Sequence, residues 1–377
     1  MEATPRSPPA LMEELVEEIL LRFPPHEPAR LIHAALVCKR WARLISGPSF
    51  RRRFRELHRA PPMLGLLCNG ISDPDGGADS CSFVPMAAFR PPPQAEHSSW
   101  RAVDSRHGRV LLRHREVFKD GGLVVWDPIT DEKRKLPILP RHTSTWNAAV
   151  LCSPGAGACD HLDCHRGPFL VILVSNHTEE TSIYTYSSSA DMWSGPISTP
   201  HPDPDGGCIH PLMPNALVGN ALYFGFLTKT RALKYELDLQ EISFIRLPPK
   251  YSGWRRAVLT ATEGGGLGFV TVHESKLCVW SRKAGLEVDD GWIRNRAIDL
   301  EMLLSDDAIL TSASVVGSVD GVGIIFLRSN GVIYTVDLKT NKLKKVYEGR
   351  AIITVVPYMS FYTPELGAVC TGHGPSA

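Results

Sequence analysis

The chain has 377 residues, of which 43% are hydrophobic and 21% are charged. This balance is typical of a globular protein and excludes a largely disordered or fibrous chain. With 41 Lys and Arg against 40 Asp and Glu, the formal net charge is +1, which predicts neither a nucleic-acid partner nor an anionic membrane surface. The apolar runs are too short to span a bilayer, so we expect no membrane. Irregularly spaced cysteines and the lack of an apolar leader predict reduced thiols and a cytoplasmic or nuclear protein.

The first 60 residues have the periodicity and punctuation of helices. After a tail, residues 1–10, apolar residues recur from Leu11 at helical spacing, with glutamates on the opposite face. Pro24-Pro25 ends this helix, and two more short helices are expected before Ser46-Gly47-Pro48. A basic amphipathic piece, Phe50 to Leu57, follows. Three helices of this length cannot bury all their apolar surface among themselves, which indicates a protein interface.

Residues 11 to about 46 resemble the F-box motif. The resemblance lies in Leu11 to Pro24, Leu31 and Val37-Cys38-Lys39-Arg40-Trp41. It implies a small all-α three-helix module, residues 11–60, that docks on the Skp1 adaptor of a cullin-based ubiquitin ligase. The docking residues that it implies are Leu11, Leu15, Ile19, Leu20, Pro24, Leu31, Val37, Cys38 and Trp41. Met12 stands where the family usually has proline, so we expect a frayed start of the first helix rather than lost binding. The alternative is a helical hairpin that merely caps the rest of the chain.

Residues 61–363 contain a repeat of strand, hairpin, strand, turn and strand. Apolar strands end in Asp or Ser at positions 127, 187, 238, 281 and 337. Their mean spacing of about 52 residues, close to that of kelch repeats, predicts an all-β propeller of six blades. One period back lies Asp75, the turn of a first blade, and the run 352–356 is expected to pair with that blade and close the ring. Asn330-Gly331 predicts a type I′ hairpin turn, and residues 364–377 are expected to be a tail.

These blades resemble the degenerate kelch-like repeats that follow the F-box in large plant families. The resemblance implies a propeller that binds a target protein. Together with the F-box it implies the substrate-recognition subunit of a Skp1–cullin–F-box ligase, with the identity of the substrate left open. Two alternatives remain. One is a Skp1-bound scaffold outside the ligase, and the other is a carbohydrate-active propeller enzyme, which would need clustered carboxylates at one end of the central channel.

Motifs for catalysis are missing from the sequence. It contains no phosphate-binding loop, no zinc-protease helix and no nucleophile elbow, so we predict an adaptor without catalytic residues or cofactor. One group resembles a metal site: Cys152, Cys159, His161 and Cys164. Its spacing lacks the two close pairs of ligands that zinc sites usually show. We therefore interpret it as a loop between blades and expect no bound metal.

Overall fold

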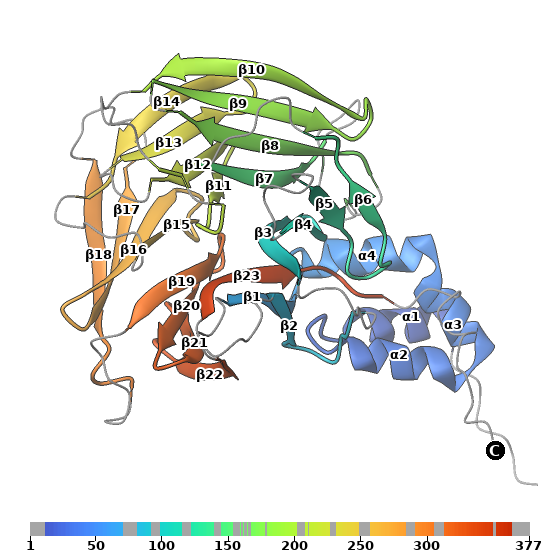
Figure 1. The fold of residues 1–377 in the computed structure, drawn as a ribbon. Helices are drawn as coiled ribbons and strands as arrows, with labels where there is room; N and C mark the ends of the chain where they lie inside the picture. The colour runs from blue at the N-terminus through green and yellow to red at the C-terminus, as the bar shows by residue number, and fades with distance from the viewer. Residues whose placement is uncertain are drawn as a thin grey trace, which may run out of the picture.

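The computed structural model describes residues 12–363 except for the segments 71–80, 92–98, 115–121, 139–144, 154–158, 160, 162–163, 165–166, 178, 202–207, 210, 227–230, 249–256, 284–290, 305–312 and 350–351. Within these residues, four helices precede six small antiparallel sheets arranged in a ring (Figure 1). The predicted tails and the predicted turn at Asp75 lie outside the described residues.

The helices are α1 (Glu13–Leu21), α2 (Pro28–Val37), α3 (Lys39–Ser46) and α4 (Pro48–His58). The basic amphipathic piece is thus a full helix, which makes four helices in place of the three predicted. Pro28 and Pro48 each stand in the first helical turn, where a missing N–H costs nothing. Cys38, in extended conformation, separates α2 from α3. The prolines that the sequence offers as punctuation therefore set the helix boundaries.

The helices share one apolar core. Its most buried members are Leu20, Leu31, Ile45, Phe50 and Phe54. Arg53 of α4 forms ion pairs with Glu17 and Glu18 of α1, at 2.8 and 2.6 Å. The basic face of α4 is therefore partly neutralised by the glutamate face of α1.

The strands of the ring are β1 (Met63–Gly70), β2 (Cys81–Pro85), β3 (Trp100–Arg106), β4 (Arg109–His114), β5 (Leu123–Trp126), β6 (Lys133–Lys135), β7 (Trp146–Cys152), β8 (Phe169–Asn176), β9 (Glu180–Ser187), β10 (Met192–Pro200), β11 (Ala216–Val218), β12 (Ala221–Gly225), β13 (Arg231–Glu236), β14 (Glu241–Arg246), β15 (Ala257–Ala261), β16 (Leu267–His273), β17 (Lys276–Arg282), β18 (Trp292–Asp299), β19 (Ser314–Val319), β20 (Ile324–Ser329), β21 (Val332–Asp337), β22 (Leu343–Glu348) and β23 (Ile352–Met359).

Five of the blades have four described strands each, β3 to β6, β7 to β10, β11 to β14, β15 to β18 and β19 to β22. The sequence predicts the last three strands of these blades but not the first, which runs along the centre of the ring. Three of these first strands, β11, β15 and β19, have three, five and six residues, and most residues of β15 and β19 are buried. A short strand that is buried on both faces has no polar alternation to mark it.

The remaining blade, which the sequence predicts as the first, joins the two ends of the ring. We call it the sixth blade. Its described strands lie in the order β2-β1-β23. β23 pairs antiparallel with β1, with Leu66 opposite Pro357 and Cys68 opposite Val355. The predicted closure of the ring by the run 352–356 is therefore confirmed, and it removes an exposed sheet edge.

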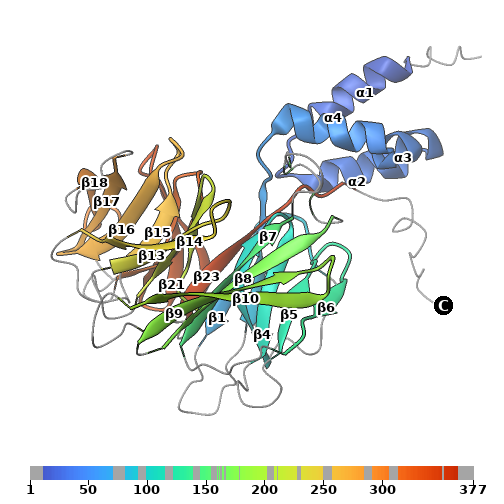
Figure 2. The ribbon, with the colours of Figure 1, turned by 90° about the horizontal axis from the view of Figure 1, so that it is seen from above.

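The chain that follows β23 joins the helical module to the ring. Phe361 lies in the helical core, and its ring centroid is 6.2 Å from that of Phe54. The next residue, Tyr362, packs on the other side, against Phe89 of the sixth blade, at 5.2 Å between centroids. Figure 2 shows the four helices grouped at one side of the ring, where the end of β23 reaches them. The helical core is therefore completed by a residue from the far end of the chain.

The β20–β21 hairpin has the turn that the sequence predicts. Asn330 has φ 48° and Gly331 has φ 76°, so both central residues are left-handed, as in a type I′ turn. We expect Gly331→Ala to lower the free energy of unfolding by about 1 kcal/mol, because an L side chain is strained at this φ. Gly264→Ala is the matched control, since Gly264 lacks a positive φ and has open space around it. Equal urea midpoints for the two variants would contradict this reading of the turn.

Candidate functional site

Apolar side chains stand exposed on the helical module. Leu15 and Ile19, one turn apart on α1, are 48% and 50% exposed, and Leu36 and Val37 at the end of α2 are 63% and 66% exposed. Cys38 beside them is exposed too. We call these five residues the docking face. Large exposed apolar side chains on a small module are typical of a protein interface.

An ion pair links α3 to α1. Arg40 in the first turn of α3 donates to Glu13 in the first turn of α1, at 3.4 Å. The start of α1 therefore lies next to the junction of α2 and α3. Met12, which precedes α1, is also exposed and offers no side-chain cap. Sequence reasoning missed Leu36, although its position at the end of an amphipathic helix, one residue before Val37, could have indicated it.

The structure separates the docking residues implied by the resemblance. Leu15, Ile19, Val37 and Cys38 lie on the docking face. Leu20 and Leu31 are almost fully buried, so their side chains support the module from within and offer no surface to a partner. Pro24 and Trp41 are half-buried, and Trp41 packs against the helical core. Leu11 lies outside the described residues.

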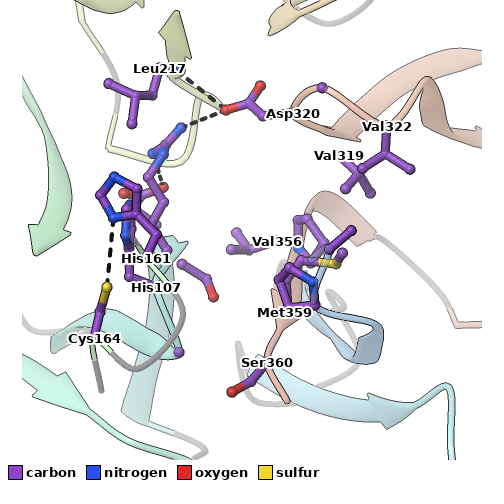
Figure 3. A pocket seen from close by; sticks show the side chains of 18 of the residues that line it. His107, His161, Cys164, Leu217, Val319, Asp320, Val322, Val356, Met359 and Ser360 are labelled. Atoms are coloured by element: carbon purple, nitrogen blue, oxygen red, sulfur yellow. Dashed lines mark hydrogen bonds and ion pairs between the residues drawn. The ribbon is translucent and has the colours of Figure 1, made fainter. Parts of the chain in front are cut away.

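A cavity of about 510 Å³ lies between the helical module and the mouth of the central channel. Arg55, Arg59 and Pro61 line it on the side of the helices. Figure 3 shows other residues of its wall, among them His107, His161 and Cys164 on one side and Val356, Met359 and Ser360 near the closing strand. The mouth of the channel at this end is thus enclosed by both parts of the protein.

A buried polar network surrounds Arg106 at the channel. Its guanidinium donates to Asp104 at 2.7 Å, to Asp320 at 2.9 Å and to the side-chain oxygen of Asn215 at 2.8 Å. Asp104 also accepts a hydrogen bond from the backbone N–H of Val150, and Asp320 accepts one from that of Ala261. These residues come from five blades, β3, β7, β11, β15 and the turn after β19. Residues from five blades are therefore connected to the guanidinium of Arg106, either directly or through Asp104 and Asp320.

The electrostatics of this network depend on its burial. Burial raises the pKa of Asp104, and the nearby charge of Arg106 opposes that rise. Burial also acts to lower the pKa of Arg106, but the attractions of Asp104 and Asp320 together outweigh it, so the pKa of Arg106 is raised. Two carboxylates thus do lie at the channel, as the enzyme alternative requires. All four of their oxygens accept hydrogen bonds from the protein, which is typical of a structural role.

A thiol–imidazole cluster forms part of the same cavity wall. It consists of His107, Cys152, His161 and Cys164, whose potential ligand atoms all lie within 4.8 Å of one another. Three of the four residues in the sequence candidate, Cys152, His161 and Cys164, are therefore brought together. The fourth, Cys159, lies beside the cluster, with its Sγ 3.3 Å from that of Cys164. Sequence reasoning missed His107, because it is far from the others along the chain.

The pKa values of the two cysteines in the cluster shift in opposite directions. A hydrogen bond from Cys164 and the neighbouring His107 and His161 lower the pKa of Cys152, although burial opposes this. The same contact and burial raise the pKa of Cys164. Arg109 adds a positive charge close to these thiols. The cluster thus favours one thiolate, the form of cysteine that acts as a nucleophile or metal ligand.

Two models of known protein families match this chain. A family model described as "F-box protein AT5G49610-like, beta-propeller" matches residues 101–366, and a model described as "F-box domain" matches residues 11–53. The chain belongs to this family of F-box proteins. F-box domains generally bind Skp1 in Skp1–cullin–F-box complexes, and the combination of an F-box with a propeller suggests an adaptor family. The kelch-like character of the repeats and a plant source stay predictions.

Several solved structures show a distant likeness to this F-box protein. The WD40 domain of SCAP from fission yeast is 15% identical, with a TM-score of 0.38, and the match covers 67% of this chain and 56% of that one. The Dos1 propeller is 9% identical, with a TM-score of 0.37 and coverages of 65% and 58%. This F-box protein thus spans little more than half the length of these two chains. A nidogen/laminin complex gives 10% identity, a TM-score of 0.46 and coverages of 79% and 99%.

Two further findings complete the comparison. A search of curated proteins finds no match to this F-box protein. Among its described residues, no helix has the length and apolar character needed to cross a membrane. The family assignment therefore rests on the two family models.

Proposed function

We propose that this F-box protein is the substrate-recognition subunit of a Skp1–cullin–F-box ubiquitin ligase, in the cytoplasm, the nucleus or both. The docking face carries the proposal, because it leaves Leu15, Ile19, Leu36 and Val37 exposed on the module that matches the F-box domain. A Skp1-like adaptor is the partner that this domain generally binds, and the adaptor would link the chain to a cullin. The contacts would be mainly apolar.

The propeller would hold the target protein. Its blades are antiparallel sheets arranged in a ring, and loops on such a scaffold commonly carry binding residues. The chain itself would carry out no bond chemistry. Its effect on ubiquitination would be proximity, since a target that is held near the charged enzyme presents its lysines at a raised effective concentration.

The docking face can be tested with purified adaptor. We expect Leu15→Ala and Ile19→Ala each to cost about 2 kcal/mol of binding free energy to a Skp1-like protein, or about 30-fold in Kd. Titration calorimetry on the full-length chain measures this directly. Both side chains are about half exposed, so their truncation has little effect on folding. Trp41 is a poorer test residue, because its truncation would also disturb the helical core.

The matched control is Leu239→Ala, which truncates an exposed leucine on the propeller. We expect it to leave adaptor binding unchanged. If the double variant Leu15→Ala, Ile19→Ala binds as tightly as the parent, the docking face is not the surface that binds the adaptor. If the chain binds the adaptor but never co-purifies a cullin, the Skp1-bound scaffold replaces the ligase. Hydrolysis of a glycoside by the purified chain would favour the enzyme alternative, and loss of that activity in Asp104→Asn would place it at the channel.

A further inference from the structure

The thiol–imidazole cluster joins two neighbouring blades. His107 stands in the turn between β3 and β4, Cys152 ends β7, and His161 and Cys164 lie in the connection from β7 to β8. Nδ1 of His161 is 3.0 Å from Sγ of Cys152 and 3.6 Å from Sγ of Cys164. The rings of His107 and His161 meet edge to face, with centroids 4.3 Å apart. Figure 3 shows the two imidazoles next to each other, with the dashed contact from His161 to Cys164.

Two of the separations in the cluster lie near the edges of a zinc tetrahedron, and all four ligand atoms lie within 4.8 Å of one another. Zn–S bonds of about 2.3 Å and Zn–N bonds of about 2.0 Å place neighbouring ligand atoms roughly 3.4 to 3.8 Å apart. The measured contacts of 3.0 and 3.6 Å lie close to this range. Small rotations of the side chains would bring two sulfurs and two nitrogens around one ion. Two thiolates and two neutral imidazoles also balance the charge of Zn²⁺ and suit its preference for nitrogen and sulfur.

The backbone places both imidazoles from left-handed positions, since His107 and His161 have φ 56°. At His107 this is the first residue of the two-residue turn between β3 and β4, followed by Gly108 at φ 77°, as in a type I′ hairpin. The conformation of His161 is the one that bears on the site, because left-handed residues other than glycine are concentrated at binding and active sites. In addition, Nδ1 of His107 is buried and has no hydrogen-bond partner. The side chain of His107 also forms a hydrogen bond with Cys152, which places its ring at the cluster.

The cluster is also accessible to an ion from solvent. Cys152 and Cys164 are buried, whereas His161 is exposed. His107, His161 and Cys164 line the cavity, which supplies a path of entry. We propose that His107, Cys152, His161 and Cys164 bind one zinc ion, which fastens the β7–β8 connection to the β3–β4 turn of the preceding blade. With four protein ligands the site would be structural, since a catalytic zinc keeps one position open.

Metal analysis of the full-length chain tests the proposal. The protein should be purified without a histidine tag and in reducing buffer, and its zinc content measured by mass spectrometry. We expect about one zinc ion per chain. Replacement of zinc by cobalt(II) should give the intense visible bands of tetrahedral coordination and a thiolate charge-transfer band. This spectrum needs no variant, so it does not depend on whether a variant folds.

Variants then test the ligand set. Cys152→Ser, Cys164→Ser, His107→Gln and His161→Gln should each lose the cobalt spectrum or weaken zinc binding at least about 10-fold. Cys208→Ser, a half-buried thiol elsewhere in the propeller, is the control and should keep both. Cys159→Ser should keep the metal as well. The proposal is overturned if the parent takes up neither metal, if Cys159→Ser loses the ion while His107→Gln keeps it, or if peptide mapping finds a Cys159–Cys164 disulfide in the native protein.

Discussion

Arg106→Met is expected to lower the free energy of unfolding by about 3 to 5 kcal/mol, the cost of leaving buried charges without their partner. The side chains of Arg106 and Asp104 are 11% and 9% exposed, so water cannot replace the lost ion pair. Asp320 loses the same partner. Because the network joins five blades, the loss should affect the whole ring. The midpoint of urea unfolding, with an unchanged slope, measures it.

The matched control for Arg106→Met removes a cation from the surface. Lys345→Met breaks a 2.6 Å pair with Glu348 in which the two side chains are 55% and 69% exposed, and we expect a much smaller loss of stability, because exposed ion pairs contribute little. Equal losses in the two variants would show that the network adds no more than a surface ion pair.

The pH dependence of the Arg106→Met variant gives an independent check. Arg106 opposes the rise that burial gives to the pKa of Asp104, so its removal raises that pKa further. A carboxyl group with a raised folded-state pKa binds a proton in the native protein before it does so in the unfolded chain. Stability relative to the parent must then increase as the pH falls. The deficit of the variant should be largest near neutral pH and should narrow toward acid.

Phe361→Ala is the second substitution with a large expected effect. Phe361 is buried in the helical core beside Phe54, although it follows the last strand of the propeller. Truncation of a buried phenylalanine costs about 3 to 5 kcal/mol. We expect this cost to fall on the helices, so that amide hydrogen exchange of α1 to α4 accelerates by roughly 10² to 10³-fold while the blades stay protected.

The neighbouring tyrosine is the control for Phe361→Ala. Tyr362 is half-buried and contacts Phe89 on the sixth blade, because successive side chains of an extended chain point to opposite sides. Tyr362→Ala should therefore increase exchange in the sixth blade and leave the helices protected. If both variants affect the same segment, the two residues do not separate the modules as their contacts indicate.

Local signals explain which parts of the fold the sequence could predict. Prolines next to apolar stripes set the ends of the helices, as at Pro28 and Pro48. Asn330-Gly331 specifies a hairpin through its own backbone preferences. The first strand of each blade has no comparable signal, since a segment such as Ala216–Val218 is short, apolar and enclosed. Apolar periodicity on α1 likewise indicates a helix but does not decide that Leu20 is buried while Leu15 and Ile19 are exposed.

The sites within the ring depend on contacts that no local spacing records. Arg106, Asn215 and Asp320 meet only because the blades close into a circle. His107 joins Cys152 in the same way, across the boundary between two blades. The F-box motif is different, because its docking residues lie within one short segment of the sequence. This is why Leu15, Ile19, Val37 and Cys38 could be proposed in advance, together with buried residues and without Leu36, whereas the channel network and His107 could not.

The pairing of β23 with β1 also has a consequence for synthesis on the ribosome. The helices and β1 emerge first, yet β1 must wait for residues 352–359 before its blade is complete. The helical core is complete only after Phe361 has also been synthesised. A nascent chain that stalls before this point exposes the edge of β1 and an incomplete helical core. Translation must therefore pass residue 361 before either part of the protein is finished, so a prematurely terminated chain is open to chaperones and proteases.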